Sequence, residues 1–275
     1  MKSPTIAFIG GGNMAGSLIG GLLADGVAAE SLRVADPDPT KLERFVGNHP
    51  IATYSSNADA VAGADIVVLA TKPQAIMSVA TELAGALRLR QPLVISIAAG
   101  VRTEDLVRWL GPELPVVRAM PNTPALVQAA ATALFATDRV SSEQRDLAES
   151  ILRAVGLVLW LDDETQMDAV TALSGSGPAY FFLLMEALEA AGQKLGLPAE
   201  TARLLSIETA FGAARMALES QEDAAALRQR VTSPGGTTER ALEVFDDGDL
   251  RGLVERALFS ARDRSRELAR LLGEQ

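Results

Sequence analysis

Residues 4–36 read PTIAFIGGGNMAGSLIGGLLADGVAAESLRVAD, and the rest of the chain can be interpreted outward from this stretch. An apolar run at 5–9 leads into three successive glycines at 10–12. An amphipathic segment from Asn13 follows, and a second strand-like run ends at Asp36. Strand, glycine-rich turn, helix and strand in this order are typical of a dinucleotide-binding unit. We therefore expect a nucleotide site at the start of the chain.

The spacing of the small residues supports this interpretation. Gly10 allows a tight turn off the strand, Gly12 leaves room beside a pyrophosphate, and Ala15 lets the helix pack close to the strand. The N-terminus of that helix offers free N–H groups to the phosphates. Asp36 is placed to accept hydrogen bonds from the adenosine-ribose hydroxyls, which favours NAD. An ordinary turn aspartate before Pro37 is the alternative.

Strand-like and helix-like patterns alternate up to residue 161. The strand-like runs are 5–9, 31–35, 65–70, 92–98, 115–120, 131–136 and 157–161. The helical patterns between them are 13–25, about 39–47, 57–63, 73–88, 102–109 and 141–154. Several strand-like runs are continuously apolar, which suits parallel strands covered on both faces. The alternation predicts an α/β fold with a doubly wound, Rossmann-type parallel sheet.

Beyond Leu161 the chain has only helical patterns. They lie at about 165–174, 177–195, 199–219, 222–230, 235–246 and 249–272. Residues 179–190 are apolar nearly all round, which predicts a buried helix, and a small helical domain needs a second subunit to bury it. The sequence thus predicts a dinucleotide-binding Rossmann domain at 1–162, followed by an all-α dimerisation and substrate domain at 163–275.

Loop residues follow two further strands of the predicted sheet. In open α/β sheets, ligands bind outside the carboxyl ends of the strands. We therefore expect the cofactor crevice to be lined by Ala70, Thr71, Lys72 and Pro73, and its nicotinamide end by Met120, Pro121 and Asn122. Position alone leaves Lys72 open as a catalytic acid, a phosphate contact or a solvated lysine. Two interpretations of Asn122 are open as well: it is either a polar contact of the cofactor or part of an Asn-Thr-Pro turn.

A second glycine-rich segment, VTSPGGTTERAL at 231–242, precedes a predicted helix. A helix start with glycines and two threonines is an anion-binding nest with hydroxyl donors, and it fits a small carboxylate. A simple N-cap of the helix is the alternative. The residues that we expect at this substrate site are Ser233, Gly235, Gly236, Thr237 and Thr238.

The residue types in the chain limit the kinds of catalytic site that it can form. The chain has no cysteine and a single histidine, His49, which we interpret as structural or exposed. We therefore expect neither a nucleophilic triad nor a metal site. The net charge of −10 argues against nucleic acid and anionic membranes, and we recognise no signal peptide, so we expect a cytoplasmic protein. Hydride transfer, which needs little acid–base help from side chains, fits this inventory.

Several motifs together resemble the pyrroline-5-carboxylate reductase family over essentially the whole length. Besides SPGGTT they are LATKPQ at 69–74, SIAAGV at 96–101, RAMPNTPALV at 118–127 and LSGSGPAYFFLLMEAL at 173–188. The resemblance implies reduction of the imine L-Δ1-pyrroline-5-carboxylate to L-proline in proline biosynthesis. It also implies a homodimer through the C-terminal helices, often built into a larger ring. Family members differ where this chain has Asp36, so both NADP(H) and NAD(H) stay open as cofactors.

The resemblance also implies roles for individual residues. The pyrophosphate would be held by Gly10, Gly12, Asn13, Met14 and Ala15. Asn57 would reach the adenosine ribose. Thr238 would hydrogen-bond the ring nitrogen of the substrate, and it is the one residue that we expect to act in catalysis.

Two alternatives to this function are open at the level of sequence. A β-hydroxyacid dehydrogenase-like oxidoreductase also joins a Rossmann domain to helices, but it needs a lysine in the helical part, where only Lys194 follows Lys72. A non-catalytic dinucleotide sensor would keep the first domain but would have no reason to keep the nest at 231–242.

Overall fold

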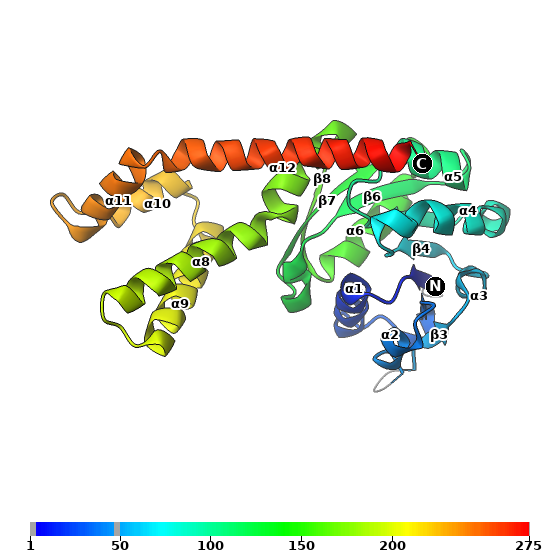
Figure 1. The fold of residues 1–275 in the computed structure, drawn as a ribbon. Coiled ribbons are helices and arrows are strands. Elements are labelled where there is room, and N and C mark those ends of the chain that lie inside the picture. The colour runs from blue at the N-terminus through cyan, green and yellow to red at the C-terminus, as the bar shows by residue number, and fades with distance from the viewer. Residues whose placement is uncertain (1–3, 47–49, 275) are drawn as a thin grey trace. The chain divides into compact units, whose positions relative to one another are not determined.

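The computed structural model describes residues 4–46 and 50–274, so His49 lies outside the described residues. Contacts divide the chain into two units, drawn in Figure 1. The first unit consists of two segments, one that ends at Ser176 and one that begins at Ala261. The second unit is Gly177–Ser260. Residues 163–176 thus belong with the sheet. The division into a cofactor domain at 1–162 and a substrate domain at 163–275 stays a prediction.

The first unit is built on one eight-stranded sheet with the strand order β3-β2-β1-β4-β5-β6-β7-β8. The strands are β1 (Ile6–Ile9), β2 (Leu32–Ala35), β3 (Ala52–Tyr54), β4 (Ile66–Leu69), β5 (Leu93–Ser96), β6 (Val116–Met120), β7 (Ala130–Ala136) and β8 (Gly156–Trp160). All neighbours are parallel except β6 and β7, which are antiparallel. The predicted Rossmann-type α/β fold is confirmed, with one strand, β3, that the sequence pattern did not predict.

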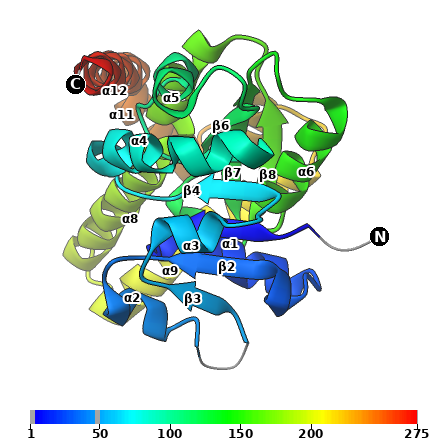
Figure 2. The same ribbon diagram turned by 90° about the vertical axis from the view of Figure 1, so that its right-hand side faces the viewer.

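Helices cover both faces of this sheet, and Figure 2 shows α3 and α4 along one of them. The helices of the first unit are α1 (Asn13–Ala24), α2 (Pro39–Glu43), α3 (Asn57–Val61), α4 (Pro73–Arg90), α5 (Thr103–Leu110), α6 (Ser142–Arg153) and α7 (Met167–Val170). Shorter turns of 3₁₀-helix occur at Ala29–Ser31, Thr123–Val127 and Glu164–Gln166, and Thr171–Gly175 forms a π-helix. The single helix that we predicted at 165–174 is therefore three short helical segments.

Side chains alternate along the strands and so build one hydrophobic core on each face. In β1, Ile6 and Phe8 pack into a core shared with α1, α2 and α6. Ala7 and Ile9 pack into the opposite core, which is shared with α3, α4 and α5. Because β1 is buried on both faces, it is apolar throughout, as expected of a parallel strand.

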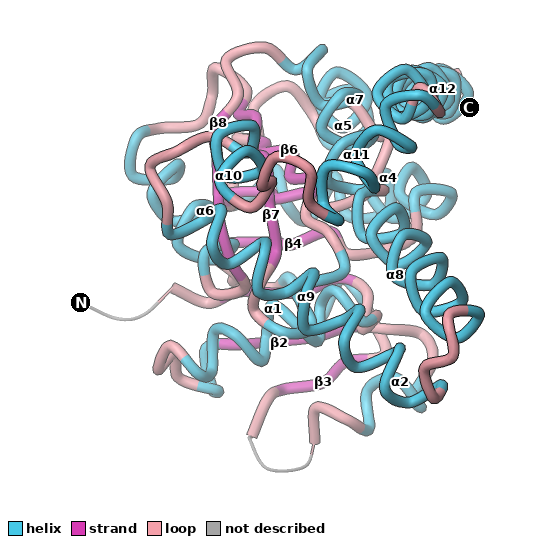
Figure 3. The backbone as a smooth tube through the Cα atoms, turned by 90° about the vertical axis from the view of Figure 1, so that its left-hand side faces the viewer, coloured by secondary structure: helices cyan, strands magenta, loops and turns pink. Residues whose placement is uncertain are grey.

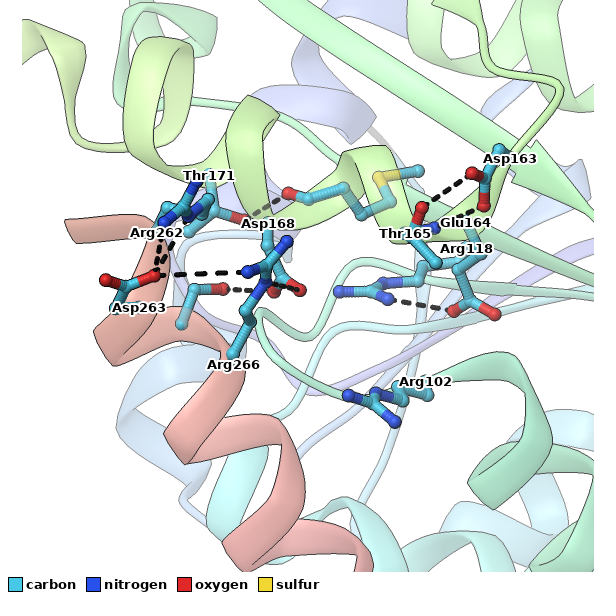
Figure 4. A network of polar contacts seen from close by, with 12 residues as sticks. Arg102, Arg118, Asp163, Glu164, Thr165, Asp168, Thr171, Arg262, Asp263 and Arg266 are labelled. Carbon is cyan, nitrogen blue, oxygen red and sulfur yellow. Dashed lines mark hydrogen bonds and ion pairs between the residues drawn. The ribbon is translucent and has the colours of Figure 1, made fainter. Parts of the chain in front are cut away.

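Polar contacts tie the end of the first unit to the sheet, as Figure 4 shows. The Arg118 guanidinium on β6 lies 2.8 Å from Glu164 Oε1 and is 5% exposed. Glu164 also accepts hydrogen bonds from the backbone N–H and the hydroxyl of Thr103, the first residue of α5. A carboxylate at a helix N-terminus is favoured by the helix dipole. Further along, Ser265 of α12 (Leu250–Gly273) donates to Asp168 at 2.7 Å.

The second unit contains only helices among its residues, all of which the structure describes (Figure 3). They are α8 (Gly177–Lys194), α9 (Ala199–Glu219), α10 (Ala224–Arg230), α11 (Thr237–Asp247) and the first part of α12. Large apolar side chains are exposed here; for example, Phe181 and Phe182 on α8 are 63% and 64% exposed. Apolar surface of this extent on a folded chain indicates a site of protein association.

Candidate active site

The strand order reverses beside β1, and this reversal defines a ligand crevice. From β1 the chain continues to β2 on one side, whereas β4 lies against its other side. Ligands of open α/β sheets bind at such a switch point, outside the carboxyl ends of the strands. The residues after β1, β2 and β4 are therefore the candidate cofactor contacts.

The glycine turn after β1 is shaped by close backbone contacts. Gly10 has a φ of +103°, and a Cβ at this position would lie 2.6 Å from the carbonyl oxygen of Ala70, at the end of β4. No side chain other than hydrogen fits there. Gly12 is the N-cap of α1 and makes no side-chain capping hydrogen bond. The first N–H groups of α1, from Asn13 onward, are thus available to an anion.

The two residues that follow in α1 serve the packing of this helix. Ala15 is fully buried, and Met14 is partly buried against the same core. The small side chain of Ala15 lets α1 lie close to β1, as the motif requires. Both residues are near the predicted pyrophosphate site through their backbone position at the start of α1.

Asp36, directly after β2, is 4% exposed and already has several hydrogen-bond donors. Its Oδ2 accepts from the N–H of Gly11 at 2.9 Å, and its Oδ1 accepts from the N–H of Asp38 at 2.9 Å. Lys41 Nζ lies 3.2 Å from both oxygens. Burial raises the pKa of Asp36, but the two amides and Lys41 outweigh it and hold the pKa below its ordinary value. Asp36 therefore stays ionised and organises the glycine turn.

Arg44 is a further cation at this turn. Its Nη2 donates to the carbonyl oxygens of Gly11 and Gly12, and its Nη1 donates to Asn13 Oδ1 at 3.3 Å. The guanidinium also lies over the ring of Phe45, 4.9 Å from the centroid. The turn that would face the phosphates is thus bordered by a fixed positive charge, which suits a nucleotide polyanion.

The residues after β4 and β3 lie at the same edge of the sheet. Thr71 follows Ala70, and its Oγ1 is a buried oxygen without a hydrogen-bond partner among the described residues. Lys72 is the exposed N-cap of α4, and Pro73 is the first residue of that helix. Asn57 begins α3 and donates to Glu82 Oε2 on α4 at 3.3 Å. An orphaned hydroxyl beside the Gly10–Ala70 contact fits a bound nicotinamide nucleotide, which would supply its missing partner.

The carboxamide of Asn122 is engaged by the protein itself. Its Nδ2 donates to the carbonyl oxygen of Ser174 at 3.0 Å, and its Oδ1 accepts from the N–H of Ala131 at 3.0 Å. Asn122 is therefore a link between the strand ends and the π-helix. Met120 ends β6, and its methyl group packs at Gly175. A cofactor at this end of the crevice would meet the side chain of Met120 and the backbone around Pro121.

The nest at 233–238 belongs to the second unit and begins α11. Gly235 has a φ of +71°, and Gly236 is the N-cap, without a side-chain capping hydrogen bond. The N–H of Gly236 donates to the carbonyl oxygen of Ser233 at 3.0 Å, which closes the turn. Thr237 and Thr238 are the first two residues of α11 and are both exposed. Their N–H groups therefore lie at a helix start that no N-cap side chain satisfies.

Two contacts of these sites are absent from the sequence-based predictions. Arg44 is five residues beyond Pro39 at the start of α2, and nothing in its sequence setting connects it to the glycine turn. Glu239 Oε2 accepts from the N–H of Gly235 at 2.7 Å. A glutamate at the third position of a helix is typical of a hydrogen bond back to the residues before it, so the sequence does carry a signal for the contact of Glu239.

The described residues contain no group of three or more metal-ligating side chains. Within the same residues, no helix combines the length and apolarity that crossing a bilayer demands.

Comparison with protein families gives two matches. Residues 164–268 match the model of pyrroline-5-carboxylate reductase dimerisation, and residues 5–100 match that of NADP oxidoreductase, coenzyme F420-dependent. The first match includes the exposed helices of the second unit, and the second includes the glycine turn and the ends of β2 and β4. A β-hydroxyacid dehydrogenase is therefore not favoured.

Relatives of known identity match over their full length. The pyrroline-5-carboxylate reductase of Pseudomonas aeruginosa is 55% identical over 274 residues, with 100% of both chains covered. That of Haemophilus influenzae is 44% identical, with 98% of this chain and 100% of the relative covered. The structure of the Coxiella burnetii enzyme superposes with a TM-score of 0.93 at 49% identity, covering 97% of this chain and 99% of that chain. The chain belongs to the pyrroline-5-carboxylate reductase family.

Proposed function

We propose that this family member reduces L-Δ1-pyrroline-5-carboxylate to L-proline by hydride transfer from NADPH, the last step of proline biosynthesis. The observation that carries the proposal is the pair of helix starts whose N-cap is a glycine, one after Gly10–Gly12 and one after Ser233–Gly236. The first fits a dinucleotide pyrophosphate, and the second fits the substrate carboxylate. A sensor that only bound the nucleotide would use the first of them alone.

Each site has a distinct task in this reaction. The N–H groups at the start of α1, with Arg44 beside them, hold the pyrophosphate. The N–H groups at the start of α11 hold the substrate carboxylate, and the hydroxyl of Thr238 hydrogen-bonds the ring nitrogen. Reduced nicotinamide, when bound, supplies the hydride to the imine carbon. Since this carbon must meet the nicotinamide in a fixed orientation, positioning is the main contribution of the protein.

The proposed activity is tested by following the near-ultraviolet absorbance of reduced nicotinamide. Purified protein is mixed with pyrroline-5-carboxylate and either NADPH or NADH, with β-hydroxy acids plus the oxidised nucleotides as a second substrate class. Oxidation that depends on the imine supports the proposal. Binding of the nucleotide without turnover of either class would favour the sensor instead.

We further propose that NADPH is preferred to NADH. The charge of Asp36 is balanced by Lys41, whose side chain is 48% exposed, and Arg44 adds a second cation at the same turn. A 2′-phosphate on the adenosine ribose would therefore have the Lys41 ammonium as its partner, beside the buried carboxylate of Asp36. A solved relative from Plasmodium falciparum, 29% identical with a TM-score of 0.86 and covering 98% of this chain and 99% of that chain, is described with NADP bound.

Substitution of Lys41 by alanine is expected to lower kcat/KM for NADPH about tenfold and to change that for NADH by less than about twofold, because one charge-assisted contact to the phosphate is lost. The matched control is Arg139→Ala, which removes a positive charge after β7, a strand remote from β2 in the sheet order. Steady-state kinetics with both nucleotides measure the ratio. An equal loss with NADPH and NADH would mean that Lys41 only supports the fold around Asp36.

The chain forms a homo-oligomer, in keeping with its dimerisation module. We propose that the contact is made through the helices of the second unit, where apolar side chains such as Phe211 are 60% exposed, and that the protein acts in the cytoplasm. Sedimentation equilibrium is expected to give a mass that is an even multiple of 28.9 kDa at micromolar concentration. A mass of one chain under these conditions would contradict the assignment.

A further inference from the structure

Glu239 places a carboxylate of the protein on the nest that we assign to the carboxylate of the substrate. Its Oε2 accepts a 2.7 Å hydrogen bond from the N–H of Gly235. Glu239 is the third residue of α11 and is half-buried, so its side chain reaches back over the start of its own helix. A carboxylate that accepts from a backbone N–H makes a charge-assisted hydrogen bond, the same interaction that a substrate carboxylate would make there.

Neither glycine N–H of the nest is left without an acceptor. Gly235 donates to Glu239, and Gly236 donates to the carbonyl oxygen of Ser233. The second of these bonds closes the turn and holds its shape. Only the hydrogen bond from Gly235 is accepted by a side chain, that of Glu239, which can rotate away. A ligand carboxylate therefore either displaces Glu239 from Gly235 or binds beside it, with two negative charges at one helix start.

We propose that Glu239 sets the substrate affinity by competing with the substrate carboxylate for the nest. The inference rests on the proposed function of the nest. The product of the reaction carries the same carboxylate as the substrate, so Glu239 weakens the binding of both. The residue thus keeps KM high and favours release of proline. It takes no part in the hydride transfer itself.

A purely structural role for Glu239 makes the opposite prediction. As a capping residue it would hold Gly235 in its left-handed conformation, and its loss would damage the nest. Glu239→Gln keeps an oxygen acceptor for the Gly235 N–H but removes the charge. Glu239→Ala removes both. The two variants therefore separate repulsion from capping.

The test measures KM for pyrroline-5-carboxylate and the inhibition constant of L-proline in the wild type, Glu239→Gln and Glu239→Ala. With competition, both constants fall about fivefold in Glu239→Gln, the size of the repulsion between two unit charges about 4 Å apart in water. They also fall in Glu239→Ala, while KM for NADPH stays unchanged. The matched control is Glu243→Gln, which removes an equal charge one turn further along α11.

Unchanged or higher constants in Glu239→Gln would overturn the inference while the proposed function stands. A rise in KM confined to Glu239→Ala, together with a lower Tm, would establish a cap instead. Absence of imine turnover by the wild type would overturn the proposed function, and this inference with it. The wild-type assay therefore separates the two failures.

Discussion

Substitution of Gly10 by alanine is expected to lower both the stability of the protein and its affinity for NADPH, the latter by more than about tenfold, or about 1.4 kcal/mol. The φ of +103° at Gly10 is one that a residue with a side chain rarely adopts, and the new Cβ would lie 2.6 Å from the carbonyl oxygen of Ala70. Keeping the native turn would cost about 1–3 kcal/mol of strain. Moving the turn would separate β1 from β4 at the place to which we assign the pyrophosphate.

Two other glycines provide contrasting controls for this variant. A Cβ at Gly12 meets no atom within 4 Å, so Gly12→Ala is expected to leave Tm unchanged and to weaken only the nucleotide, which it would touch. Gly85, in the middle of α4, also has open space, and Gly85→Ala is expected to stabilise the helix by about 0.5–1 kcal/mol without changing nucleotide affinity. Thermal unfolding and fluorescence titration with NADPH measure the two quantities. A Gly10→Ala variant with wild-type affinity would show that the close contact with Ala70 is not needed for the site.

Much of the fold could be predicted because apolar runs and amphipathic segments alternate so regularly. β1, β4 and β5 are apolar runs bounded by turns, β2 differs from them only by Arg33, and the parallel pairing of these strands follows from the helices between them. β3 is a three-residue strand, too short to leave a periodic signal. β7 follows β6 after a 3₁₀-turn at Thr123–Val127 instead of a full helix, which allows the antiparallel return that an apolar run alone cannot reveal.

The candidate site could be predicted where topology alone decides it. Strand ends at a switch point come together whatever their side chains are, so Gly10, Asp36 and Ala70 lie near one another as expected. The hydrogen-bond partners of a side chain cannot be predicted in this way, because they depend on how elements distant in the sequence pack together. Asn122 was expected as a polar contact of the cofactor, and its carboxamide instead joins Ser174 to Ala131. A direct role of that side chain stays a prediction without support from its geometry.

The two proposed ligand sites use the same physical device at different places in the chain. Each has a glycine at positive φ, Gly10 or Gly235, followed by a glycine N-cap and a helix whose first N–H groups lack a side-chain cap. By contrast, α2 and α6 are capped by Asp38 and Ser141. Where a side chain satisfies the helix start, an anion gains little by binding there. α5 and α9 also start without a side-chain cap and after a glycine at positive φ, so the glycine N-caps Gly12 and Gly236 are the feature that sets α1 and α11 apart from them. A glycine N-cap without a side chain is consistent with sites for charged ligands.

The hydroxyl of Thr238 is expected to be the most important side-chain group for turnover. Thr238→Val keeps the shape of the side chain and removes the hydroxyl, and it is expected to lower kcat by more than about tenfold, at least about 1.4 kcal/mol in the activation barrier. The reason is that the ring nitrogen of the imine loses its one proposed side-chain hydrogen bond as its charge changes during reduction. Thr238→Ala should behave in the same way. Pre-steady-state and steady-state rates of NADPH oxidation measure the effect.

Thr238→Ser decides between a hydroxyl role and a packing role, because it keeps the hydroxyl and loses only a methyl group. Recovery of most of the wild-type rate in Thr238→Ser, with loss in both Thr238→Val and Thr238→Ala, would fit a hydrogen bond to the substrate. NADPH affinity should be the same in all three variants, since Thr238 is the second residue of α11 and the nucleotide is assigned to the glycine turn before α1. If Thr238→Val turns over as fast as the wild type, positioning of the imine does not depend on this hydroxyl. The backbone N–H groups of the nest would then be left to orient the substrate through its carboxylate alone.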